Sequence, residues 1–179
     1  MDITDDTAGR LPEIVALFTE SFSAAEGPEE GAAVGHLARR MITQTPAPDL
    51  RVFLAQESGA IIAAICFSRL GHGGDGRSVF LLSPVAVATA RQGQGIGRRL
   101  IVHGLAALRE EGVDIAVTYG DPDFYGRVGF RPVSEEILPA PFPLGQPEGW
   151  LACPLTQAPL ARLAGPVRCV AALADPSFW

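Results

Sequence analysis

The sequence predicts a mixed α/β domain of the α+β type, in which helices pack on a central sheet with both antiparallel and parallel strands. Apolar runs with strand character alternate with amphipathic helical patterns along the chain. Two of the runs, 51–56 and 60–70, are separated only by Glu57-Ser58-Gly59, which indicates an antiparallel hairpin. Two others, 79–87 and 114–119, enclose a helical segment, so they should pair in parallel.

Size and composition are typical of one soluble globular domain. A chain of 179 residues can fill one core and is short for two, which predicts a single domain over residues 1–179. The longest apolar run, 60–67, is far shorter than the ~20 residues of a membrane span, and no signal peptide opens the chain. We therefore expect a cytoplasmic protein with no membrane partner, as a monomer or a homodimer.

Charge and cysteine usage exclude further classes. The net charge of −6 disfavours nonspecific binding of nucleic acid. Cys66, Cys153 and Cys169 are scattered, with no paired-cysteine motif, and the three histidines are isolated from one another. We therefore expect neither a disulfide framework nor a metal site.

The first fifty residues predict a short strand and two helices. The strand is expected within 1–6, and the first helix starts near Pro12, where apolar residues recur on one face. The small residues and glycine of 21–28 predict a loop. A second helix is expected over 29–41, before Pro46 stops it.

A glycine-rich loop follows the strand 79–87. It reads Gln92-Gly93-Gln94-Gly95-Ile96-Gly97 and leads into a helix that Gly112 ends. Glycine lets a ligand approach the main chain closely, and the first turn of a helix presents unpaired N–H groups and the positive end of the helix dipole. The loop therefore predicts a cradle for a pyrophosphate. The alternative is a turn that merely joins a strand to a helix, for which one glycine would suffice.

Spacing excludes two other phosphate-binding motifs. The string G-x-x-x-x-G-K-[ST] of the NTPase loop does not occur in the chain. The dinucleotide pattern G-x-G-x-x-G, counted from Gly93, meets Arg98 where its third glycine should stand. A nicotinamide-dependent oxidoreductase is therefore disfavoured.

The pattern that remains, Q-x-x-G-x-G from Gln92 to Gly97, resembles the acetyl-CoA signature of the GNAT N-acetyltransferase superfamily. The likeness includes the apolar strand before the loop and Arg-Arg-Leu after it, and the core of the motif region spans about 51–133. It implies a central, mostly antiparallel sheet flanked by helices, with a splayed parallel strand pair that binds the coenzyme. It also implies acetyl-CoA as the acyl donor, and a primary amine of a small molecule or protein as the acceptor.

The same resemblance implies which residues hold the coenzyme. The strand before the loop would pair its backbone with the pantetheine arm, and the loop amides would hold the pyrophosphate, whereas the arginines after the loop either add charge or are simply solvated. The expected coenzyme-binding residues are Val85, Ala86, Val87, Gln92, Gly93, Gln94, Gly95, Ile96, Gly97 and Arg98.

Tyr125 is the expected catalytic residue. The segment from Phe124 to Phe130, FYGRVGF, resembles the family's Tyr-x-x-x-Gly-Phe element, whose tyrosine faces the coenzyme sulfur. A phenol with a pKa of ~10 stays protonated at neutral pH and can donate its proton to the departing thiolate. The alternative is a tyrosine that packs its ring and points its hydroxyl to solvent.

The base and the acceptor site are expected in loops and helix starts near the cleft. An ammonium acceptor must lose a proton before it attacks. The candidates for accepting it are Glu26, Glu29, Glu30 and Asp121. Ser83 could orient the substrate. The alternatives are solvated surface acids or helix caps for the carboxylates, with Asp121 capping a short helix, and a backbone-bonded strand serine for Ser83.

The last third of the chain, 135–179, is irregular and rich in proline, with short strands expected at 150–155 and 167–170. The segment 139–147 is longer than the fold requires and could form a lid, a surface packing element or a dimer contact. No cysteine lies within the motifs, which favours direct attack by the amine over an acyl-enzyme. The alternative function is a non-catalytic acyl-CoA sensor, which would bind the coenzyme without turnover.

Overall fold

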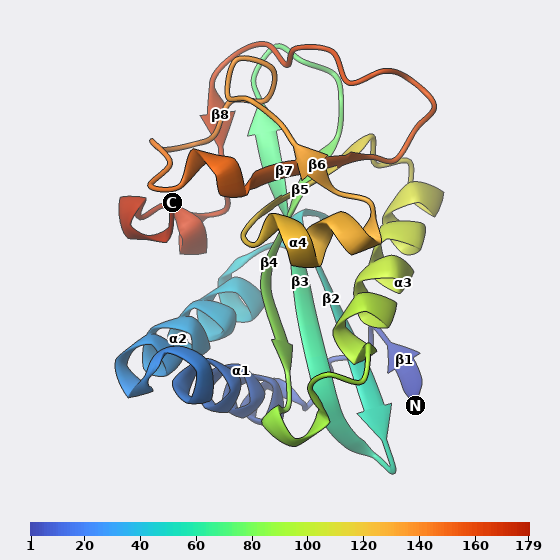
Figure 1. The fold of residues 1–179 in the computed structure, drawn as a ribbon, viewed down its shortest axis with the longest axis vertical. Coiled ribbons are helices and arrows are strands. Elements are labelled where there is room, and N and C mark those ends of the chain that lie inside the picture. Colours follow the sequence, from blue (N-terminus) through green and yellow to red (C-terminus); the bar gives the residue numbers. More distant parts are fainter.

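One sheet organises the protein, in a computed structural model that describes all 179 residues (Figure 1). Its strands lie in the order β1-β2-β3-β4-β5-β7-β6, and β8 pairs with the end of β3. Every pair is antiparallel except β4 with β5, which confirms the expected mixed, mostly antiparallel sheet. The strands are β1 (Asp2–Thr4), β2 (Leu50–Glu57), β3 (Ala60–His72), β4 (Val79–Val87), β5 (Ile115–Tyr119), β6 (Arg131–Pro132), β7 (Trp150–Pro154) and β8 (Val167–Arg168).

Helices cover both faces of the sheet. The pair α1 (Leu11–Glu26) and α2 (Pro28–Gln44) covers one face, and α3 (Ile96–Glu110) covers the other (Figure 1). The short α4 (Pro122–Tyr125) follows β5 beside the point where β4 and β5 part (Figure 1). Single 3-10 turns occur at Ala47–Asp49, Thr89–Arg91, Gly126–Val128, Pro147–Gly149, Ala171–Leu173 and Pro176–Phe178. None of the helices combines the length and the apolar character needed to cross a membrane.

The prediction of a loop over 21–28 is wrong. Helix α1 continues through Ser21 to Glu26, and α2 begins two residues later, after Gly27 with its φ of 102°. Tertiary contacts explain the difference, because Ser21 is buried and its hydroxyl donates to the carbonyl of Val87 at 3.1 Å. The end of α1 is thereby fixed against the end of β4.

Two apolar clusters, one on each face of the sheet, hold the layers together. The larger packs Ile14, Phe18 and Met41 of the helix pair on the sheet, and the second packs Leu100 and Leu108 of α3 on its other face. Burial of such side chains is the main stabilising contribution, about 1.5–3 kcal/mol for each large one. The helix pair and α3 are therefore fixed on either side of the central strands.

Glycines lie where neighbouring elements come closest to one another. A Cβ on Gly104 would lie 2.5 Å from the ring of Phe67, and one on Gly31 would lie 2.5 Å from the carbonyl oxygen of Thr19. These glycines let α3 lie close to β3 and α2 lie close to α1.

Candidate functional site

Strands β4 and β5 part halfway along their length. Their pairing covers Val79–Leu82 and Ile115–Thr118 and then stops, while β4 continues to Val87 paired with β3 only. On its other side β4 carries a bulge, where Ser83 and Pro84 together oppose the single Cys66 of β3. The backbone of 85–87 therefore has no strand partner on its β5 side.

Two cavities meet at this opening. The first, here called the loop cavity, has a volume of about 500 Å³ and follows the glycine-rich loop. The second, here called the helix cavity, has a volume of about 550 Å³ and lies between the helix pair and the ends of β4 and β5. The two share Val85, Phe124 and Tyr125. A molecule in one cavity can therefore reach a molecule in the other beside Tyr125.

The glycine-rich loop turns the start of α3 toward the loop cavity. Gly93 and Gly95 have φ values of 73° and 74°, in the left-handed region that glycine adopts without strain. Gly95 is the N-cap of α3 and no side chain caps the helix, so the amides of 96–98 have no acceptor within it. This arrangement fits a bound anion.

The charge that lines the loop cavity is positive. Arg91, Arg98 and Arg127 line it, and no acidic residue does. Arg91 forms an ion pair with Glu57, whereas Arg98 and Arg127 form none. Arg127 was not expected from the sequence as a binding residue, because only its position in the folded chain brings it beside the loop.

Most of the expected coenzyme residues lie at the loop cavity. Two do not: Ala86 is 2% exposed and points into the core beneath the helix pair, and the exposed side chain of Gln94 lies outside both cavities. The side chain of Gln92 donates to the carbonyl of Val87 at 3.1 Å, which ties the loop to the end of β4. The expected residues that line the cavity are Val85, Val87, Gln92, Gly93, Gly95, Ile96, Gly97 and Arg98.

Tyr125 lies at the junction of the two cavities, at the end of α4. Asp121 begins this helix by accepting from the amide of Asp123 at 2.9 Å, as expected for a capping residue. The Tyr125 ring packs edge-on against Phe124 and Phe130, with centroids 5.0 and 5.8 Å away. Burial raises the pKa of the phenol above its ordinary value, and the neighbouring Thr118 hydroxyl opposes part of that rise. The phenol is therefore a protonated donor at neutral pH.

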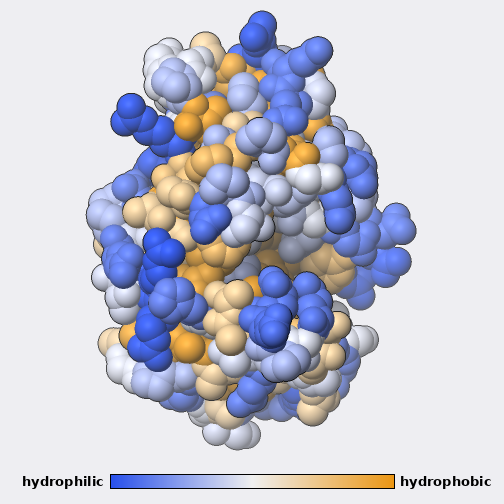
Figure 2. Space-filling view, turned by 90° about the vertical axis from the view of Figure 1, so that its left-hand side faces the viewer, coloured by the Kyte–Doolittle hydropathy of each residue, from blue (hydrophilic) through white to orange (hydrophobic).

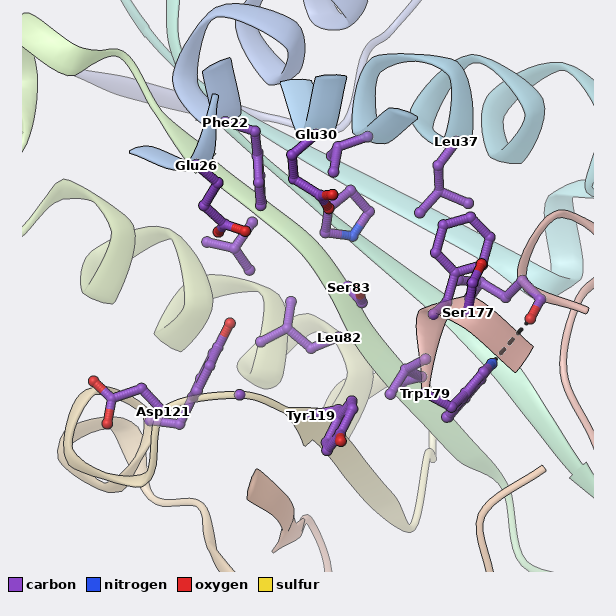
Figure 3. Close-up of a pocket in the computed structure, with 18 of the residues that line it drawn as sticks. Phe22, Glu26, Glu30, Leu37, Leu82, Ser83, Tyr119, Asp121, Ser177 and Trp179 are labelled. Atoms are coloured by element: carbon purple, nitrogen blue, oxygen red, sulfur yellow. Dashed lines mark hydrogen bonds between the residues drawn. The ribbon is translucent and has the colours of Figure 1, made fainter. Parts of the chain in front are cut away.

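Four of the five candidate acceptor-site residues line the helix cavity, and the exposed Glu29 does not. Glu26 and Glu30 extend toward it from the junction of α1 and α2, and Ser83 lies between the two walls (Figure 3). Asp121 lies on the opposite wall, with its carboxylate turned away from the two glutamates (Figure 3). No lysine, arginine or histidine lines this cavity.

The C-terminal tail forms a wall of the helix cavity that sequence reasoning missed. Leu173, Ser177, Phe178 and Trp179 line it, and the indole of Trp179 donates to the carbonyl of Leu173 at 3.0 Å. On the face that carries the helix pair and this tail, the surface is hollowed, with apolar residues inside and hydrophilic ones around them (Figure 2). The adjacent aromatic residues at 178–179 are visible in the sequence, but no local sequence pattern shows that they pack near the helix pair.

The proline-rich segment lies beside this wall. Gly145 and Gln146 line a third cavity of about 480 Å³ together with Tyr119 and Trp179. The amide of Gln146 donates to the Tyr119 hydroxyl at 2.6 Å. The segment therefore packs against the end of β5 and the C-terminal tail.

No thiol lies at either cavity. Burial raises the pKa of the Cys66 thiol to about 12, and burial also raises the pKa values of the Cys153 and Cys169 thiols. These thiols stay protonated at neutral pH, which removes the nucleophilic thiolate form.

Comparison with known proteins gives one consistent family. A model described as acetyltransferase (GNAT) domain matches residues 48–132. The uncharacterized N-acetyltransferase YjhQ of Escherichia coli K12 is 34% identical over 128 residues, covering 69% of this chain and 68% of that protein.

Two solved structures share the fold over nearly the whole chain. The GNAT-family N-acetyltransferase YhbS of Escherichia coli, in complex with CoA, aligns with a TM-score of 0.81 and 24% identity, over 97% of this chain and 92% of that one. A GNAT-family acetyltransferase of Brucella melitensis, in complex with acetyl-CoA, aligns with a TM-score of 0.74 and 27% identity, over 96% of each chain.

Proposed function

Because this chain belongs to the GNAT superfamily of acetyltransferases, we propose that it moves an acetyl group from acetyl-CoA to a primary amine by direct attack. The observation that carries this proposal is the meeting of two cavities of opposite charge at Tyr125. The loop cavity is positive and suits the donor, and the helix cavity is negative and suits a protonated amine.

The loop cavity fits the chemistry of acetyl-CoA. The free amides of 96–98, with Arg98 and Arg127, match a diphosphate in charge and in hydrogen-bonding capacity. The backbone of 85–87 has no strand partner on its β5 side, although the Val87 carbonyl already accepts from Ser21 and Gln92. Such a strand edge suits an extended arm that carries amide groups. Bound there, acetyl-CoA supplies a thioester carbon open to attack and a thiolate leaving group.

The acids of the helix cavity would bind and deprotonate the acceptor. Glu26 and Glu30 form no ion pairs, so their charge remains available to an ammonium group. Asp121 already caps α4 and its carboxylate points away, so the two glutamates, directly or through a water, are the better candidates for the base (Figure 3).

Tyr125 would complete the proton balance. The base first takes one proton from the ammonium group, and the neutral amine then attacks. As the C–N bond forms and the C–S bond breaks, the nitrogen loses its second proton to water and the phenol proton passes to the sulfur, after which water reprotonates the phenolate. No cysteine lines either cavity, so direct attack is favoured over a cysteine acyl-enzyme.

The test is release of free CoA thiol from acetyl-CoA by the purified protein, with and without amines. We expect amines to stimulate release, and Tyr125→Phe to lower kcat by about 10²-fold or more while acetyl-CoA affinity is kept. Tight binding with no release for any amine, unchanged by Tyr125→Phe, would instead favour a coenzyme-binding sensor.

A further inference from the structure

The helix cavity is predominantly apolar, although it is proposed to receive a cation. Of its 19 lining residues, 12 are hydrophobic, and its volume of about 550 Å³ is that of a small-molecule pocket. Phe22, Val34 and Leu37 contribute one apolar wall from the helix pair, and Phe178 and Trp179 contribute another from the tail. Such a lining favours an apolar ligand body, because burial removes its surface from water.

The carboxylates lie at one end and in the middle of this cavity, with Glu30 between Glu26 and Leu37 (Figure 3). Glu26 and Asp121 lie toward one end, whereas Leu37, Ser177 and Trp179 lie toward the other (Figure 3). Asp121 and Tyr125 are the cap and the last residue of the same short helix, so the charged end is also the end next to the junction with the loop cavity. An acceptor that fits therefore has its amine at one end and an apolar body at the other.

Few uncharged polar groups line the apolar end. Of the hydroxyls that line the cavity, that of Tyr119 already accepts from the amide of Gln146, which leaves those of Ser83, Tyr125 and Ser177. No asparagine, glutamine or basic side chain lines the cavity. A ligand with many hydroxyls would lose hydrogen bonds to water without replacing them, which costs free energy for each group. A second cationic group would have to be buried against the apolar side chains of Leu37 and Trp179, which costs free energy.

On these grounds, and resting on the proposed acetyl transfer, we propose that the acceptor is a monoamine with an apolar, ring-sized body. Its ammonium end lies between Glu26, Glu30 and Tyr125, and its body packs against Leu37, Phe178 and Trp179. Phe178 is a specificity-determining residue, since its ring forms part of the wall that the apolar body contacts and it is not itself deeply buried. The indole–carbonyl bond from Trp179 to Leu173 keeps the neighbouring wall fixed.

The experiment compares acceptor classes in the thiol-release assay. The probes are 2-phenylethylamine, the short amine ethanolamine, the polyamine spermidine and the aminoglycoside kanamycin. We expect kcat/KM for 2-phenylethylamine to exceed that for each of the others by at least 10-fold. If spermidine or kanamycin is the better substrate, the proposed amine specificity is wrong although the proposed acetyl transfer stands. If no amine stimulates release while acetyl-CoA binds, both proposals are overturned.

A substitution tests the wall itself. Phe178→Ala should raise KM for 2-phenylethylamine about 10-fold and leave KM for ethanolamine and acetyl-CoA nearly unchanged. Val102→Ala is the matched control, because Val102 is an apolar residue 54% exposed on α3, outside the cavity. Equal changes in KM for both amines in Phe178→Ala would contradict a role for this ring in acceptor choice. If Phe178→Ala lowers the melting temperature, Phe178→Leu serves as a second variant, because it retains an apolar side chain. We expect Phe178→Leu to have the parental melting temperature and a KM for 2-phenylethylamine between those of the parent and Phe178→Ala.

Discussion

The ring of Tyr125 packs directly on the backbone of Gly120, so that a Cβ at Gly120 would lie 2.8 Å from ring carbon Cε2. Gly120 directly follows β5, two residues before α4 begins, and its amide donates to the carbonyl of Gly149 at 2.9 Å. A glycine backbone therefore forms the surface on which the proposed proton donor rests.

Adding a methyl group at this point should displace the phenol without removing it. We expect Gly120→Ala to lower kcat by about 10-fold or more, because small misplacement of a reacting group is costly, and to leave acetyl-CoA affinity within about 2-fold. Gly76→Ala is the matched control, since Gly76 lies in open space with ordinary φ. A Gly120→Ala variant with parental kcat would show that the Tyr125 position does not matter for turnover.

Burial of Tyr125 makes a prediction about pH. Its pKa lies above the ordinary value near 10, so the phenol keeps its proton throughout the neutral and mildly alkaline range. We expect kcat, measured from pH 6 to pH 9.5 by thiol release, to show no decline from loss of this proton. A decline centred below pH 9 that disappears in Tyr125→Phe would contradict the role of proton donor.

The anion cradle should be sensitive to negative charge. Gly95→Asp places a carboxylate at the free amides of α3, and we expect acetyl-CoA to bind at least 10-fold more weakly, as measured by calorimetry. Gly74→Asp is the control, because Gly74 also has a positive φ, 94°, and lies outside the loop cavity. If a folded Gly95→Asp variant holds acetyl-CoA as tightly as the parent, the cradle is wrongly assigned.

The close contact of α1 and α2 should couple helix packing to acceptor binding. A Cβ on Gly31 would lie 2.5 Å from the carbonyl oxygen of Thr19 and 2.7 Å from the amide nitrogen of Ser23, both backbone atoms. Gly31→Ala must therefore push the helices apart, with a loss of about 1–3 kcal/mol in stability. Because Glu26 and Glu30 flank the junction, KM for the amine should rise while KM for acetyl-CoA changes little. Equal stability of Gly31→Ala and Gly76→Ala in thermal unfolding would refute this packing.

Low pH should reduce the stability that the loop after β3 contributes to the fold. Asp75 accepts from Arg77 Nε at 2.9 Å and from the amide of Ala164 at 3.2 Å, and Arg77 donates to the carbonyls of Ala161 and Arg162. The bonds from Arg77 hold the pKa of Asp75 well below its ordinary value of 3.8. The stability from this carboxylate is therefore present above pH 3.8 and is lost as pH falls below it.

Asp75→Asn tests this dependence. We expect its Tm at pH 7 to lie about 2–4 °C below that of the parent, and the difference to shrink as the pH is lowered from 4 to 2. Glu135→Gln, at an exposed acid outside any helix and with no ion pair, should show no such difference. A gap between Asp75→Asn and the parent that stays constant with pH would contradict the coupling.

The sequence by itself determined the parts of this protein that depend on neighbouring residues. The hairpin at 57–59, the left-handed glycines at 93 and 95 and the cap at Asp121 follow from backbone preferences over two to six residues. The strand–loop–helix–strand unit, and with it the parallel pair, follows from the same local patterns.

Only the tertiary structure determined which segments form the helix cavity. It extended α1 through 21–26 by bonding Ser21 to Val87, and it brought Phe178 and Trp179 to Glu30 across about 150 residues of chain. The physical reason is that hydrogen bonding and dihedral preference act along the chain, whereas the shape and charge of a cavity arise from packing between segments that no local spacing links.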